Sequence, residues 1–172
     1  MRDRFDLVAD TGGGNSGTER WIEVLQERPR DRPFFLWLAA VDPHRGYGGE
    51  GGAPQVHDPD AVLVPRKLPD TPAVRADLAR YYDEITRLDT RLGEVRRELE
   101  RQGIARSTYL FFLSDNGRPF PGAKTTLTDD GIRTPLIIPR PGTIPAGTTS
   151  EALVSSIDLG PTVLELAGLP SM

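Results

Sequence analysis

Residues 109–124 read YLFFLSDNGRPFPGAK, an apolar run that ends abruptly in Ser-Asp-Asn-Gly. A continuous apolar run of this length predicts a strand buried on both faces of a parallel sheet. In open α/β sheets, ligands bind beyond the carboxyl ends of the strands. Asp115 and Asn116 stand at that end and carry the oxygen ligands that Ca²⁺ and Mg²⁺ prefer, and Lys124 can contact an anion. The stretch therefore predicts an α/β fold with a metal or anion site at the sheet edge.

A second apolar run, PFFLWLAAV, covers residues 33–41 and is followed by Asp42, Pro43 and His44. It predicts another buried strand. A histidine after a strand is more often a structural hydrogen-bonding residue than a catalytic one, although its pKa suits acid–base work. Because parallel strands end at the same edge of a sheet, we expect His44 to lie near Asp115.

The longest predicted helix covers residues 72–102. Thr71 suits the N-cap position, and Gly103 is a helix stop. Apolar residues recur three and four positions apart, which predicts one buried face that packs in the core, with a coiled-coil partner as the alternative. Shorter elements are predicted at 18–28 (helix), 136–138 (strand) and 158–166 (helix, with Asp158 as its cap).

Two stretches rich in glycine or proline are predicted to be loops. Residues 11–17 lack the lysine-containing signature of a phosphate-binding loop, which favours a plain loop. Residues 46–71 form a long excursion, and loops of this length are either binding loops or disordered. We predict that His57 within it is a solvated loop residue, with a ligand role as the alternative.

Composition excludes several classes of function. The chain has 172 residues, a net charge of −4, 37% hydrophobic and 27% charged residues, which is ordinary for one globular domain, predicted over 1–172. It contains no cysteine, so disulfides, thiolate metal sites and a cysteine nucleophile are excluded. The basic residues are dispersed, which argues against nucleic-acid binding. No apolar run is long enough to span a bilayer, and the first residues do not resemble an export signal.

Six motifs follow one another along nearly the whole chain. They are PFFL (33–36), DPHR (42–45), LARYY (78–82), RLD (87–89), SDNG (114–117) and IDLGPT (157–162). In this order they resemble the sulfatase family of the alkaline-phosphatase-like superfamily. The form DNGRPFP with the basic Lys124 is similar to the heparan N-sulfatase branch of that family. The resemblance implies a mostly parallel sheet flanked by helices.

The resemblance also implies roles for the polar residues. Asp115 and Asn116 would be two ligands of a Ca²⁺ ion, preferred over Mg²⁺, that also holds a sulfate oxygen. Lys124 would contact the sulfate, and His44 would lie against the sulfate and the leaving atom. A cation and an ammonium stabilise charge that develops on sulfuryl oxygens, and an imidazole can protonate the departing atom.

The implied substrate is a sulfated saccharide. Heparan N-sulfatases carry Arg where this chain has Lys124, so sulfate esters and sulfamates both stay open. Phosphodiester or phosphonate hydrolysis is a further alternative, because clamps for sulfate and phosphate look alike.

Two parts of the family pattern are missing from these 172 residues. The nucleophile, a formylglycine, arises from a C/S-x-P-x-R motif that the sequence does not contain. The family's adjacent pair of aspartate ligands precedes the Asp-Asn motif, whereas the pair here, Asp129 and Asp130, follows it and is predicted to be a solvated turn. We therefore expect a partial catalytic domain that lacks the N-terminal strand and the C-terminal subdomain.

Such a partial domain has expected consequences. The chain alone would be inactive, and a non-catalytic product or binding remnant is the alternative. Unfinished sheet edges would make it marginally stable, or lead it to associate with the missing part or with itself. The family suggests a periplasmic, secreted or lysosomal location.

Overall fold

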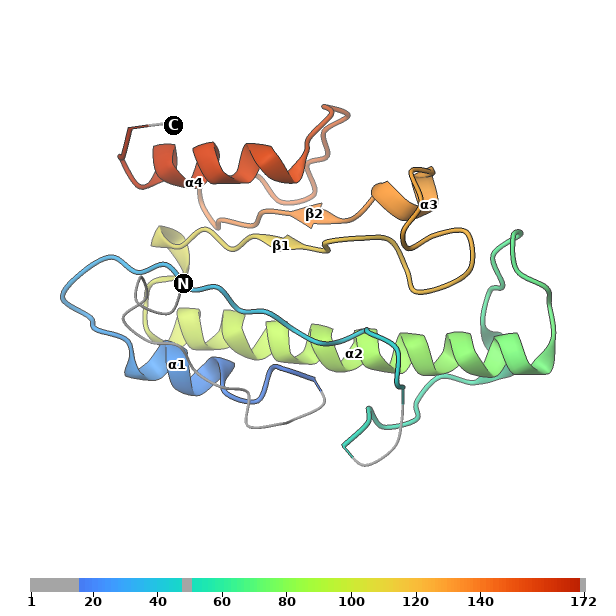
Figure 1. The fold of residues 1–172 in the computed structure, drawn as a ribbon. Coiled ribbons are helices and arrows are strands. Elements are labelled where there is room, and N and C mark those ends of the chain that lie inside the picture. The colour runs from blue at the N-terminus through green and yellow to red at the C-terminus, as the bar shows by residue number, and fades with distance from the viewer. Residues whose placement is uncertain (1–15, 48–50, 171–172) are drawn as a thin grey trace. The chain divides into compact units, whose positions relative to one another are not determined.

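The computed structural model describes residues 16–47 and 51–170 (Figure 1). The chain forms two compact units, which end and begin at Arg140 and Pro141. Each unit is described by itself. None of the helices in this described part is long and apolar enough to cross a membrane.

The first unit is built on helix α2, Pro72–Arg101 (Figure 1). The Thr71 hydroxyl caps it by accepting a hydrogen bond from the Val74 N–H at 3.3 Å. Gly103 follows the helix with a φ of 72°, a left-handed conformation that ends helices. The predicted helix over 72–102 is therefore confirmed, together with its cap and its stop.

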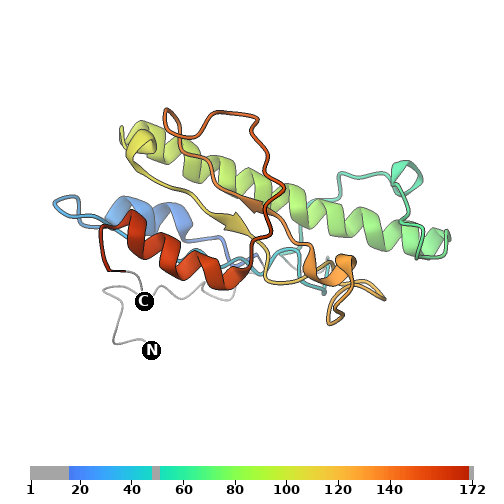
Figure 2. The ribbon, with the colours of Figure 1, turned by 90° about the horizontal axis from the view of Figure 1, so that it is seen from above.

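Helix α1, Trp21–Glu27, lies beside the C-terminal part of α2 in both views (Figures 1 and 2). Trp21 and Leu25 form a buried cluster there with Val95 and Leu99 of α2. Burying side chains of this size contributes about 1.5–3 kcal/mol each. The predicted helix over 18–28 is confirmed, although it begins three residues later.

The apolar run over 33–41 is extended but only half-buried (Figure 1). Phe34, Leu36 and alternate residues after them pack against the α1–α2 cluster. Phe35 and Trp37 point the other way and are 58% and 74% exposed. The prediction of a fully buried strand is wrong, because within the described residues only one face is covered and no strand pairs with this segment.

Strand β1, Phe112–Leu113, pairs with strand β2, Leu136–Ile137. The pairing is antiparallel and sets Phe112 opposite Ile137. It differs from the parallel sheet that the apolar runs predicted. Parallel neighbours need a long crossover, usually a helix, and the connection between these strands contains only the four-residue helix α3, Asp129–Ile132. The described residues thus form a partial α/β fold with a small antiparallel sheet.

A second buried cluster anchors two long loops on the N-terminal half of α2. It joins Val62, Leu78, Ala79 and Phe120. The short helix η2, Pro59–Ala61, also lies on α2, where the Arg75 guanidinium donates to three carbonyl oxygens of the loop, those of Pro59, Asp60 and Val62. The part of the excursion after residue 50 is therefore ordered against α2.

The second unit contains η4, Ser156–Asp158, and α4, Leu159–Leu166. The Asp158 carboxylate accepts a hydrogen bond from the Ser155 N–H at 2.7 Å, and Gly168 ends the helix with a φ of 71°. The predicted helix over 158–166 is confirmed. Helix α4 has no buried residue: Leu166 is 43% exposed, and Ile157 of η4 before it is 79% exposed.

Candidate functional site

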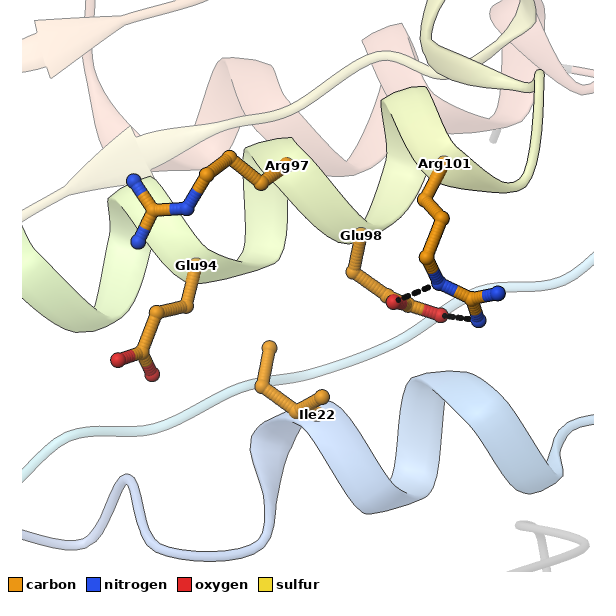
Figure 3. A pocket seen from close by; sticks show the side chains of 5 residues that line it. All are labelled: Ile22, Glu94, Arg97, Glu98 and Arg101. Carbon is orange, nitrogen blue, oxygen red and sulfur yellow. Dashed lines mark hydrogen bonds and ion pairs between the residues drawn. The ribbon is translucent and has the colours of Figure 1, made fainter.

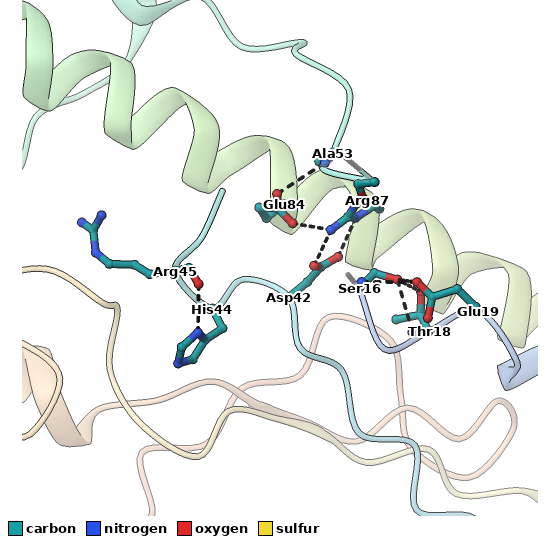
Figure 4. A network of polar contacts seen from close by, with 10 residues as sticks. Ser16, Thr18, Glu19, Asp42, His44, Arg45, Ala53, Glu84 and Arg87 are labelled. Atoms are coloured by element: carbon teal, nitrogen blue, oxygen red, sulfur yellow. Dashed lines mark hydrogen bonds and ion pairs between the residues drawn. The ribbon is translucent and has the colours of Figure 1, made fainter. Parts of the chain in front are cut away.

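A buried ionic network holds the chain just before His44 (Figure 4). Arg87 of α2 donates from Nε and Nη2 to the two Asp42 carboxylate oxygens, at 2.8 and 2.7 Å. Its Nη2 also donates to Glu84 Oε2 at 2.5 Å. The Asp42 and Glu84 side chains are 1% and 6% exposed. Because the Arg87 guanidinium binds both carboxylate oxygens of Asp42, the end of the 33–41 segment is fixed to α2.

The same network fixes the loop after residue 50. Arg87 Nη1 donates to the Gly51 carbonyl oxygen at 2.6 Å, and the Ala53 N–H donates to Glu84 at 3.4 Å. Burial raises the pKa of Glu84, and its contact with Asp42 raises it further. The Asp42 carboxylate in turn raises the pKa of Arg87. The network therefore places two carboxylates around one guanidinium under the candidate site.

The first described residues also hold the end of the 33–41 segment, through a contact at Val41. The Ser16 carbonyl oxygen accepts a hydrogen bond from the Val41 N–H at 2.8 Å. Gly17 has a φ of 72°, and a Cβ atom there would lie 2.9 Å from the Val41 nitrogen. This close approach requires glycine. Residues 11–15 of the predicted plain loop lie outside the described residues.

Arg45 joins the loop of His44 to the loop that follows β1. Its Nε donates to the Pro119 carbonyl oxygen at 2.7 Å. Its Nη1 and Nη2 donate to the Asp77 carboxylate of α2 at 3.0 and 2.6 Å. Its guanidinium also lies 4.9 Å from the centre of the Phe120 ring. The two predicted site loops are therefore connected through one side chain.

His44 itself is exposed at the surface of this region. Its ring Nδ1 lies 3.0 Å from the Arg45 carbonyl oxygen, and the two side chains extend in different directions from the loop (Figure 4). Because a carbonyl oxygen can only accept, Nδ1 is the protonated nitrogen in this contact. The other nitrogen, Nε2, is then free to accept a proton.

The loop after β1 presents the other predicted residues. Asp115 is exposed, and its carboxylate has no hydrogen bond or ion pair with the described residues. Asn116 donates from Nδ2 to the Gly117 carbonyl oxygen at 2.9 Å, which leaves its side-chain oxygen available. Lys124 is half-buried, and its backbone N–H donates to the Arg118 carbonyl oxygen at 3.1 Å.

Gly117 decides the shape of this loop. Its N–H donates to the Gly131 carbonyl oxygen at 2.9 Å. A Cβ atom at Gly117 would lie 1.8 Å from the Asp130 carbonyl oxygen, so a side chain cannot fit. The glycine after Asp115 and Asn116 therefore brings these two residues close to the α3 segment.

Asp130 differs from the prediction of a solvated turn. Its carboxylate accepts from Lys67 at 2.5 Å and from Arg118 at 2.9 Å, and its side chain is 21% exposed. The Lys67 hydrogen bond holds the pKa of Asp130 below its usual range. The prediction is wrong for Asp130, because two cations from distant segments converge on it.

His57 is also not the solvated residue that we predicted. Its Nδ1 lies 2.8 Å from Asp83 Oδ1, and the Val56 and His57 N–H groups donate to the same oxygen at 2.9 Å. Burial raises the pKa of Asp83, but these hydrogen bonds more than offset it and hold the pKa below its usual range. His57 is a half-buried anchor of its loop on α2.

Two hollows lie on the first unit. One, of about 310 Å³, is lined by α1 and α2 residues, among them Ile22, Arg97 and the ion pair of Glu98 with Arg101 (Figure 3). It contains none of the predicted site residues. The other, of about 240 Å³, is lined by His44 together with residues of the ionic network. The second hollow therefore adjoins the candidate site.

The described residues supply only part of a metal site. Within 16–47 and 51–170, no three His, Asp or Glu side chains gather as metal ligands. No hydrogen bond or ion pair joins His44, Asp115, Asn116 and Lys124 to one another in that part of the chain. The sequence did not predict a role for Arg45, which joins the loop of His44 to the loop after β1. It also did not predict one for Arg87, which holds Asp42 and Gly51. The available signal was the Arg-Leu-Asp motif, which sets a charged Arg87 beside the apolar stripe of α2.

The similarity of this sequence to known proteins extends over the candidate site residues. A family model described as Sulfatase matches residues 15–169. The chain is 42% identical over 162 residues to N-sulphoglucosamine sulphohydrolase from Homo sapiens, covering 81% of this chain and 32% of that relative. It is 35% identical over 120 residues to an ulvan-active sulfatase from Formosa agariphila, covering 69% and 20%. It is 38% identical over 184 residues to N-acetylgalactosamine-6-sulfatase from Mus musculus, covering 97% and 32%. The chain thus spans about a third or less of the length of these relatives.

Proposed function

The chain belongs to the sulfatase family, and we propose that it supplies one part of a site that hydrolyses sulfated saccharides. The residues of that part are His44, Asp115, Asn116 and Lys124. One observation carries the proposal: Arg45 connects the loop of His44 with the loop of the other three. The names of the relatives, all sulfatases, support a sulfate group as the reacting group.

The donor set fits a hard cation such as Ca²⁺. Asp115 offers a carboxylate with no partner among the described residues, and Asn116 offers a free side-chain oxygen. Oxygen ligands of this kind suit Ca²⁺, which takes six to eight of them. When bound, the cation would stabilise negative charge on the sulfuryl oxygens. Two ligands alone bind weakly, so further ligands must come from residues beyond this pair.

Lys124 and His44 have complementary tasks in this proposal. The ammonium of Lys124 pairs with the sulfate as a point charge. His44 donates a hydrogen bond from Nδ1–H to the Arg45 carbonyl oxygen, so Nε2 is the nitrogen that takes up a proton and passes it to the departing oxygen or nitrogen. The hollow of about 240 Å³ that His44 lines supports the binding of a saccharide beside this residue.

We propose that the 172 residues do not turn over substrate by themselves. They contain no C/S-x-P-x-R motif from which the family's nucleophile is made. The same absence favours the second candidate, a non-catalytic remnant that binds a cation or an anion weakly. Similarity to N-sulphoglucosamine sulphohydrolase favours a sulfamate over a sulfate ester.

A chimera tests the proposal. The part of this chain that aligns with the human N-sulphoglucosamine sulphohydrolase replaces the aligned segment of that protein. Sulfate release from N-sulphoglucosamine is then measured beside a sulfate ester and a phosphate ester. We expect release of sulfate, with Asp115→Asn and Lys124→Ala each lowering kcat/KM by about 10²-fold or more. Lys67→Ala is the matched lysine control, because Lys67 is 61% exposed and its ion pair within the described residues is with Asp130.

Three outcomes decide against the proposal. A folded chimera without sulfate release favours the binding remnant. A preference for the phosphate ester favours phosphodiester or phosphonate chemistry. Full activity of the Asp115→Asn chimera would contradict the proposed role of Asp115 as a metal ligand.

A further inference from the structure

We propose that Arg45 is a positioning residue that fixes the loop of His44 against the loop from Asp115 to Lys124. This inference rests on the proposed function, in which these two loops act on one sulfate group. Arg45 touches neither loop's reacting groups with its guanidinium. It acts instead through the backbone of Pro119 and through the carboxylate of Asp77.

The three contacts of Arg45 reach two segments, the loop after β1 and helix α2. The Pro119 carbonyl oxygen lies in the loop after β1, at 2.7 Å from Nε. Asp77 lies on α2 and receives both Nη atoms. Phe120, which follows Pro119, belongs to the buried cluster on α2, and its ring faces the guanidinium at 4.9 Å. Arg45 thus attaches the loop of His44 both to the loop after β1 and to α2.

This combination requires arginine. The planar guanidinium offers Nε and two Nη donors in a fixed fork, so it can bind a carboxylate and a carbonyl oxygen at once. A lysine ammonium is a point charge, and it cannot reproduce that geometry. Lysine at position 45 should therefore keep the ion pair with Asp77 but release the Pro119 contact.

The exposure of the Arg45–Asp77 ion pair indicates that its role is to position the loop and that it contributes little to the stability of the fold. The Arg45 and Asp77 side chains are 45% and 33% exposed. Ion pairs at this exposure contribute little to the stability of a fold. Loss of Arg45 should therefore lower the melting temperature by only a few degrees, about as much as loss of an ordinary surface pair.

The absence of cysteine makes the loop geometry measurable in the intact chain. His44→Cys and Pro121→Cys place one spin label in each loop, both at exposed positions. We expect a single narrow distance distribution, which becomes roughly twofold broader or more when Arg45→Ala or Arg45→Lys is added, because the tether is lost. Arg91→Ala is the matched control, since Arg91 pairs with Glu94 on the surface of α2 and contacts neither loop.

The ring of His44 gives a second readout that a loss of stability would not change. The chain has only two histidines, and in both the Nδ1 proton faces an oxygen. Because the tautomer follows the hydrogen bond, ¹⁵N chemical shifts should show Nδ1–H for both rings. With Arg45→Ala, we expect His44 to lose this preference while His57 keeps it as an internal reference.

The outcomes separate this inference from the proposed function, because neither metal nor substrate is present. Broadening together with a changed His44 tautomer supports the positioning role, whether or not the chimera releases sulfate. Unchanged distances and tautomer in Arg45→Ala overturn it. If Arg45→Ala instead loses the helical circular dichroism signal, Asp77→Asn is the second variant, and the same loss there also overturns it by showing that the pair holds the fold.

Discussion

Replacing Arg87 by methionine should destabilise the first unit strongly. The change removes three hydrogen bonds to carboxylates, at 2.8, 2.7 and 2.5 Å, and leaves Asp42 and Glu84 facing each other at 1% and 6% exposure. Breaking a buried pair by removing one partner costs about 3–5 kcal/mol, because the remaining charge is uncompensated. For a chain of this size, that corresponds to a fall in Tm of roughly 6–20 °C.

Urea titration followed by circular dichroism at 222 nm measures this cost, since α2 dominates the helical signal. Arg91→Met is the matched control, because Arg91 and Glu94 are 43% and 32% exposed and such a pair contributes at most about 1 kcal/mol. A rescue distinguishes charge from shape: Asp42→Asn and Glu84→Gln, added to Arg87→Met, should recover at least part of the loss.

Unfolding of Arg87→Met at the same urea concentration as Arg91→Met would contradict this prediction. That result would mean that water reaches the two carboxylates and that the network is not desolvated. A rescue by the two amides that is no larger than the error of the measurement would separately show that lost packing, not uncompensated charge, sets the cost.

Three other changes have defined outcomes. Leu78→Ala, at a side chain that is 1% exposed, should cost about 2–5 kcal/mol in the same urea titration, and a smaller loss would mean that the second cluster collapses around the cavity. Gly17→Ala should lower the Tm, because it adds about 1–2 kcal/mol of left-handed strain and a contact at 2.9 Å with the Val41 nitrogen; an unchanged Tm would contradict that geometry. Glu84→Gln should gain stability relative to the wild type as pH rises above 4.5, because the raised pKa of Glu84 means that its ionised form disfavours the fold there; Tm values measured across pH 4–7 that stay parallel would argue against it.

Helices were the part of the fold that local sequence could predict. The α2 stripe, the Thr71 cap and the Gly103 stop are all set by residues within the helix or directly beside it. These signals depend on the local geometry of the helix, so they do not change with the segments that pack against it. The family resemblance was equally readable, because motif order is a property of the sequence alone.

Strand pairing could not be predicted in the same way. An apolar run such as 33–41 is compatible with burial on one face or on two, and only its neighbours decide which. In the described residues α1 and α2 cover one face, so Phe35 and Trp37 stay exposed. The direction of β1 against β2 likewise depends on how the connecting loop returns.

The sequence by itself determined which residues we propose for the site: an aspartate and an asparagine after one apolar run, a histidine after another and a lysine beyond. Only the tertiary structure decided what holds them. Arg45 contacts Asp77 and Pro119, which lie 32 and 74 positions away, and Arg87 contacts Asp42, 45 positions away. The partners of a charged side chain are chosen by the packing of distant segments, which leaves no periodic pattern in the sequence.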